Sequence, residues 1–281
     1  MKISYEQKSE HFLPVLETLI GPLLAKVYDV LIILYLFTTT IVMIAGGGVT
    51  LQIFHIPFWT GVILFCLCTG LLFFWGLNGI LSVNSYLIPI LVAGLLYALI
   101  SFQTAHHQPW LLNLTHQYNW PAGIAFTSLN ILSVVAVLSA VGKEMKGVGE
   151  AKIASILSGL VFGAISYMYN ETLVELAGEL AHYEIPLFAV LEGAPFPIFI
   201  FMTAVLCVAI YTTTISSILG LSSRFLSLVN WPRWVIVFLL LLIMVPFTSI
   251  GFSNLIAFLY PIYGLLNLYL LVNICLLYTS P

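Results

Sequence analysis

The sequence predicts an all-α polytopic membrane protein with eight membrane-spanning helices. Hydrophobic residues make up 61% of the chain and charged residues 7%, whereas soluble domains carry about 25% charged residues. The apolar residues also fall into runs of about 20, the length of helix that crosses a bilayer. A third observation is that the eight basic residues gather on one side of the predicted membrane, as shown below.

The apolar runs predict a single transmembrane domain after a polar N-terminal segment, residues 1–22. Turn-forming sequences separate several of the runs, such as "GGG" at 46–48 and "NWP" at 230–232. The polar opening "MKISYEQKSEHF" has no apolar stretch of the kind that defines a signal peptide. The predicted spans are 23–45, 57–75, 80–102, 121–141, 151–169, 197–221, 234–250 and 255–277.

The basic residues predict the orientation of these spans. They lie before or at the start of the first span, between the fourth and the fifth, and between the sixth and the seventh. With eight spans, those three regions share one face, and basic residues remain in the cytoplasm. Both termini are therefore predicted to be cytoplasmic. The residues are Lys2, Lys8, Lys26, Lys143, Lys146, Lys152, Arg224 and Arg233.

The opposite face carries acidic and neutral residues. The stretch "ETLVELAGELAHYEI", residues 171–185, spaces acids four apart and leucines on another face, which predicts an amphipathic helix outside the membrane. The loop 103–120 supplies His106, His107 and His116. Histidines in such a loop could bind a metal or sense pH, although an uncharged loop with aromatic anchors is the favoured interpretation.

A polar group interrupts the fourth span. Thr127, Ser128 and Asn130 stand in an otherwise apolar run, next to Phe126. An amide within the membrane needs a partner, so Asn130 is expected to face protein or a water-filled cavity. Helices broken at membrane depth expose backbone groups to substrates in transporters. We therefore expect the fourth span to be discontinuous here, with hydrogen bonding between helices as the alternative.

The sixth span contains the hydroxyl-rich sequence "YTTTISSILG", residues 211–220. On a helix, Thr213, Ser216 and Ser217 share one face. Such a face offers neutral oxygen ligands of the kind that hard cations bind. The alternative is that these hydroxyls bond the carbonyl one turn back or let helices pack closely.

Three stretches resemble the bacterial YkvI-type membrane proteins: "FTSLNILSVVAVLSAVGKEMK", "YTTTISSILGLSSRF" and "LIAFLYPIYGLLNLYLL". These proteins resemble a branch of the amino acid–polyamine–cation superfamily, whose LeuT-like fold has ten helices in an inverted 5+5 repeat. The resemblance implies that the eight spans match helices three to ten, with 23–102 a partial first repeat and 121–277 the second repeat. It also implies a bacterial cytoplasmic membrane.

The resemblance further implies two sites. The unwound sixth helix of the fold would correspond to 126–130, so Phe126, Thr127, Ser128 and Asn130 are the expected substrate-binding residues. The eighth helix supplies cation ligands in sodium-coupled relatives, which implies Na⁺ binding by Thr213, Ser216 and Ser217. The first two helices of the fold, including the glycine-rich break of the first, have no counterpart in this sequence. The chain is thus expected to be an N-terminally truncated fragment of the fold.

These observations favour a secondary transporter of a small organic solute, an amino acid or amine, coupled to Na⁺ or H⁺. The alternative is a membrane sensor or assembly protein that keeps the fold without transporting, or an inactive fragment. We expect no enzymatic activity, because the spans show no acid–base pair, and no cofactor apart from Na⁺. The expected partners are the lipid bilayer and the solute, and no nucleic acid.

Overall fold

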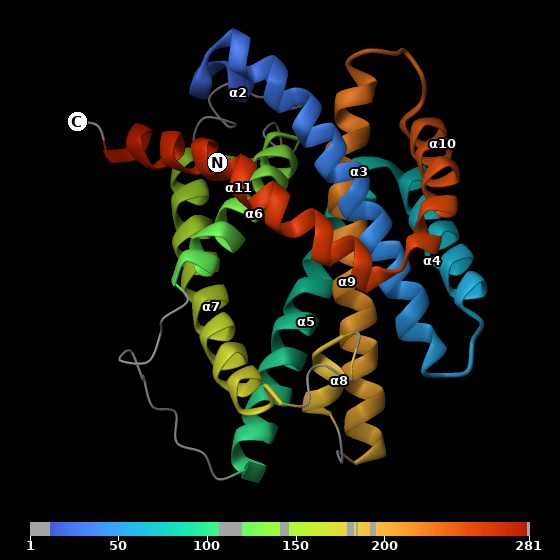
Figure 1. Cartoon of the computed structure of the whole chain (residues 1–281). Coiled ribbons are helices and arrows are strands. Elements are labelled where there is room, and N and C mark those ends of the chain that lie inside the picture. The colour runs from blue at the N-terminus through green and yellow to red at the C-terminus, as the bar shows by residue number, and fades with distance from the viewer. Residues whose placement is uncertain are drawn as a thin grey trace.

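The computed structural model describes residues 12–106, 120–140, 146–178, 183, 185–191 and 195–279, and within these ranges the chain is helical and contains no strand (Figure 1). The helices are α2 (Leu13–Ile20), α3 (Pro22–Gln52), α4 (Phe58–Leu72), α5 (Gly76–His106), α6 (Trp120–Ala140), α7 (Val148–Glu175), α8 (Leu187–Val190), α9 (Phe196–Leu226), α10 (Arg233–Met244) and α11 (Phe252–Thr279). Two 3₁₀ helices, η1 (Phe73–Trp75) and η5 (Val245–Ile250), extend α4 and α10.

The protein is a multi-pass membrane protein. Among the described residues, seven helical segments are long and apolar enough to cross a bilayer, and α4 is a shorter apolar helix of 15 residues. Each of the eight predicted spans overlaps one of these helical segments along the sequence. Because α4 is shorter than the other seven, the number of eight membrane spans stays a prediction. Large apolar side chains cover much of the surface, including Leu242, 69% exposed, and Leu265, 66% exposed, because hydrocarbon rather than water surrounds them.

Helix α9 occupies the middle of the molecule, with α3 beside it along much of its length (Figure 1). It also packs against α5, α6, α10 and α4. Its core-facing side chains include Ile215 and Ile218, both fully buried, which belong to the same hydrophobic core cluster as Leu132 of α6. The hydroxyl-rich segment of the sequence therefore lies on the most central helix of the described structure.

Helix α11 crosses α6 and also contacts α3 (Figure 1). The crossing with α6 is close at Gly264, where an added Cβ would lie 2.9 Å from the carbonyl oxygen of Ala125. A second close approach joins α3 to α4, since a Cβ on Gly61 would lie 3.1 Å from the Cα of Gly48. Small residues at such contacts let membrane helices approach closely where no hydrophobic force draws them together.

Within the described residues, the acidic stretch after the fifth predicted span does not begin a separate external helix. Helix α7 continues without a break to Glu175, so Glu171 lies within it, and a turn follows at residues 176–178. The prediction of a helix beginning at 171 was wrong because the same i, i+4 spacing equally extends an existing helix. Glu179, Glu184 and Glu192 lie outside the described residues.

The predicted N-terminal segment contains a helix of its own. Helix α2 packs against α3 and α11, and it buries Leu16 completely, together with the preceding Phe12. Gly21 separates α2 from α3 with a φ of 80°, a conformation that favours glycine. This arrangement turns the chain from α2 into the first span.

Candidate functional site

The expected break in the fourth span is absent. Helix α6 runs continuously from Trp120 to Ala140. The side chain of Thr127 donates a hydrogen bond to the carbonyl of Gly123 (2.9 Å), and the amide of Asn130 donates one to the carbonyl of Phe126 (2.8 Å). Both side chains thus satisfy their donors within their own helix, so they do not interrupt it. The prediction of a discontinuous fourth span was wrong for this reason.

The four expected substrate-binding residues lie on different sides of α6. Phe126 is 61% exposed, and Thr127 and Asn130 are also exposed. Ser128 is fully buried, and its hydroxyl contacts the carbonyl of Gly264 on α11 and that of Ala125 (2.8 Å). The structure therefore brings Ser128 into the interface between α6 and α11 and leaves the other three on an exposed face.

The three threonines of the hydroxyl-rich segment of α9 also bond within their own helix. Thr212 and Thr213 both donate to the carbonyl of Ala209, at 3.0 and 2.8 Å, and Thr214 donates to that of Ile210 (2.8 Å). Of the three expected cation ligands, Thr213 is exposed, Ser216 is half-buried and Ser217 is buried. From Thr213 to Ser217, these three residues therefore extend from the surface of α9 into the core within one helical turn.

Asn267 of α11 is a polar residue that the sequence analysis missed. Its side chain is fully buried, and among the described residues neither the oxygen nor the nitrogen of its amide has a hydrogen-bond partner. Burying an amide without a hydrogen-bond partner costs about 1–3 kcal/mol of stability by mutational data. Within the hydrocarbon of a bilayer, no water is present to hydrogen-bond it. An asparagine in the apolar run 255–277 was the available sequence signal.

Polar and aromatic groups surround this part of α11. Tyr263 lies one helical turn before Asn267, and its hydroxyl lies 3.3 Å from that of Thr38 on α3. Its ring meets that of Tyr35 edge to face, with centroids 5.1 Å apart. Two turns before Tyr35 on α3, the Tyr28 hydroxyl donates to the carbonyl of Leu266 (2.9 Å). We call Tyr28, Tyr35, Thr38, Tyr263 and Asn267 the α3–α11 polar seam.

An ion pair joins α3 to α9. The Arg224 guanidinium donates to both carboxylate oxygens of Asp29, at 2.7 and 2.6 Å, and the two side chains are 12% and 13% exposed. This two-point geometry is the strong form of an arginine–carboxylate contact. Asp29 is the acid that lies inside a predicted span, and it already has a partner.

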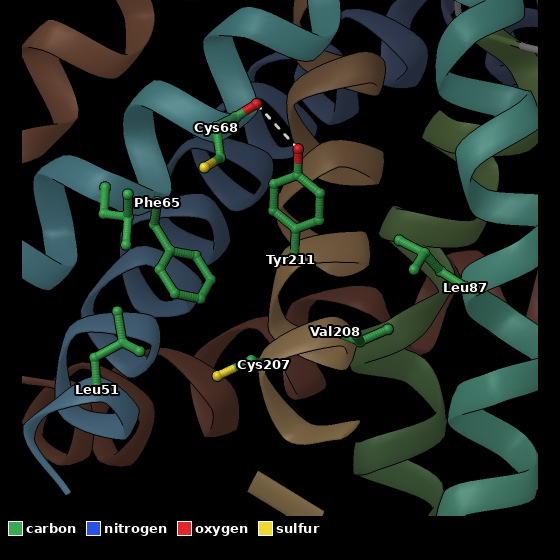
Figure 2. Close-up of a pocket in the computed structure, with 8 residues that line it drawn as sticks. Leu51, Phe65, Cys68, Leu87, Cys207, Val208 and Tyr211 are labelled. Carbon is green, nitrogen blue, oxygen red and sulfur yellow. Dashed lines mark hydrogen bonds between the residues drawn. The ribbon is translucent and has the colours of Figure 1, made fainter. Parts of the chain in front are cut away.

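A cavity of about 440 Å³ lies against α9. Figure 2 shows Phe65 and Cys68 of α4 on one side, Leu87 of α5 opposite, and Tyr211 of α9 between them. The Tyr211 hydroxyl donates to the carbonyl of Cys68 (3.0 Å). The complete lining is Leu51, Leu64, Phe65, Cys68, Leu87, Cys207, Val208 and Tyr211. The cavity thus has apolar walls and one hydroxyl that is already hydrogen-bonded.

A metal centre built from the usual ligands is not found in the described part of the chain, where no three His, Cys, Asp or Glu side chains come together. His107 and His116 of the predicted outer loop lie outside the described residues. Neutral oxygens and an amide lie on α9 and in the α3–α11 polar seam.

Comparison with known proteins assigns the family. A Bacillus subtilis (strain 168) protein named "Uncharacterized protein YyaD" is 70% identical over 277 residues, which cover 99% of this chain and 81% of YyaD. The chain belongs to the YyaD family. No protein-family model and no solved structure matches the chain, so its likeness to the YkvI-type proteins and the LeuT-like fold stays a prediction.

Proposed function

We propose that this YyaD-family protein is a secondary transporter of a small organic solute, an amino acid or amine, coupled to Na⁺ or H⁺ across the bacterial cytoplasmic membrane. The observation that carries the proposal is the fully buried amide of Asn267, without a partner in the described structure. Polar groups within a membrane are costly and mark substrate or ion pathways. An incoming solute or ion would supply the missing hydrogen bonds or ligand contacts.

The neighbours of Asn267 suit such a role. Helix α11 lies between α3 and α6, and both of those helices bring polar side chains to it, Thr38 toward Tyr263 and Ser128 toward Gly264. A solute with both donors and acceptors, such as an amino acid, matches this mixture of hydroxyl, amide and carbonyl groups.

The internal hydrogen bonds of the α9 hydroxyls are compatible with cation binding. In each bond the hydroxyl donates its proton to a backbone carbonyl, and its oxygen keeps lone pairs for another contact. Asp29 is engaged by Arg224, which favours Na⁺ over H⁺ as the coupling ion, because proton relays use ionisable groups within the membrane. Neutral oxygens bind a cation weakly enough to release it in each cycle.

Thermal stability of the purified protein in a panel of amino acids, amines and Na⁺ tests the proposal, followed by uptake into proteoliposomes. We expect a solute that stabilises the wild type to lose its effect in Asn267→Leu. Asn273→Leu is the matched control, because Asn273 lies on the same helix, is only half-buried, and donates to the carbonyl of Tyr269 (2.8 Å). Equal stabilisation of both variants, or no uptake of any stabilising solute, would favour a non-transporting membrane protein.

A further inference from the structure

The cavity between α4, α5 and α9 is separate from the α3–α11 polar seam and has a different chemistry. Its side chains are aliphatic, aromatic and thiol groups, whereas the seam contains hydroxyls and an amide. The cavity therefore raises a question of its own, namely which molecule fills about 440 Å³ of space within the spanning helices.

The polarity of the walls excludes a charged or strongly polar occupant. The single hydroxyl in the lining belongs to Tyr211, and it donates to the carbonyl of Cys68 (3.0 Å). An amino acid or an amine placed here would lose its hydration without gaining charged or free polar partners, which costs several kcal/mol. Cavities with apolar walls also stay free of water. The occupant must be apolar.

The position of the cavity indicates the source of that occupant. Leu64 of α4 lines it and is 47% exposed, and Cys68, one turn further along the helix, is exposed as well. Both residues lie in an apolar helix whose surroundings are hydrocarbon, so the opening faces the acyl chains of the bilayer. The opposite walls are Val208 and Cys207 of the central helix α9 (Figure 2).

We propose that this cavity is a binding site for one acyl chain of a membrane lipid, which inserts between α4 and α5 and rests on α9. The size falls within the range of pockets that hold small apolar ligands, about 300–1,000 Å³. The chain contacts Phe65, Val208 and Leu87, and it replaces a void that would otherwise leave these side chains without packing partners on one side. The proposal does not depend on transport activity.

Photolabelling of the protein in lipid vesicles tests the site. The probe is a phosphatidylcholine that carries a diazirine in the middle of one acyl chain, and mass spectrometry of the digested protein locates the adducts. We expect adducts at residues 64–68 and 207–211 to exceed, severalfold, those at the exposed Leu239 of α10. Equal labelling of the cavity and Leu239 would overturn the proposal.

A cavity-filling variant gives an independent test. Val208→Trp places an indole ring in the space, so the excess labelling at residues 64–68 should disappear while the labelling of Leu239 remains. Leu239→Trp, on an exposed position outside the cavity, is the matched control and should leave the excess unchanged. If Val208→Trp does not fold, the photolabelling of the wild-type protein still tests whether an acyl chain occupies the cavity. Retained excess labelling in a folded Val208→Trp protein would contradict occupancy of this cavity.

Discussion

Arg224 of α9 and Asp29 of α3 form a bidentate ion pair, with N–O distances of 2.7 and 2.6 Å. The two residues are 195 positions apart in sequence, and each side chain is nearly nine-tenths buried. Arg224 also donates to the hydroxyl of Ser227 (2.7 Å). The pair joins the central helix to α3 on the side of the membrane that the basic residues predict to be cytoplasmic.

Breaking this pair should destabilise the protein. Asp29→Asn leaves the Arg224 guanidinium buried without its counter-charge, which costs about 3–5 kcal/mol in buried pairs. We expect a clear fall in the unfolding temperature of the purified protein, measured by intrinsic fluorescence. The exposed Lys26→Gln, three residues earlier on α3, should change it little, and Asp29→Asn combined with Arg224→Gln should recover part of the loss. A stable Asp29→Asn protein would show that the pair is dispensable.

The close crossing of α6 and α11 should be sensitive to a single methyl group. Gly264→Ala places a Cβ 2.9 Å from the Ala125 carbonyl oxygen, so the helices must separate, and overpacking of this kind costs about 1–3 kcal/mol. Gly159→Ala on α7 is the matched control, because nothing lies within 4 Å of its added Cβ. There the better helix propensity of alanine should stabilise the protein by about 0.5–1 kcal/mol. Opposite shifts in unfolding temperature are expected, and a fall in both would refute this account of the crossing.

The positions of the spans could be predicted from the sequence, whereas the burial and hydrogen-bond partners of their polar residues could not. Apolar runs such as 197–221 predict a spanning helix, because a helix hydrogen-bonds its own backbone groups where the hydrocarbon offers no water. The composition of 126–130 does not reveal whether its polar groups break the helix, since Asn130 and Thr127 bond to their own backbone. Asn267 was missed because the apolar run 255–277 contains two asparagines, Asn267 and Asn273, and only the structure shows that Asn267 is the fully buried one.

The orientation of the chain remains a prediction from the basic residues, and cysteine labelling in intact cells tests it. In a variant without native cysteines, Trp110→Cys and Leu180→Cys should react with a membrane-impermeant maleimide added outside, because both positions follow spans that end at the outer face. Leu226→Cys, at the end of α9, should react only after the cells are opened. External labelling at position 226 would reverse the assigned topology.

The hydroxyls of α9 allow a test in which two neighbouring threonines make the same bond. Thr212 and Thr213 both donate to the carbonyl of Ala209, so replacing either by valine removes the same kind of contact within the helix. Thr212 is buried, whereas Thr213 is exposed and shares its face with Ser217. If the shared face binds Na⁺, Thr213→Val and Ser217→Ala should each reduce the stabilisation by Na⁺ by about 1 kcal/mol, the worth of one hydrogen-bond-strength contact. Thr212→Val should keep that stabilisation, whatever it does to the basal unfolding temperature.

The measurement is the unfolding temperature in NaCl against choline chloride at equal ionic strength. Equal responses of all three variants, or a wild type that does not respond to Na⁺, would leave helix packing as the role of these hydroxyls.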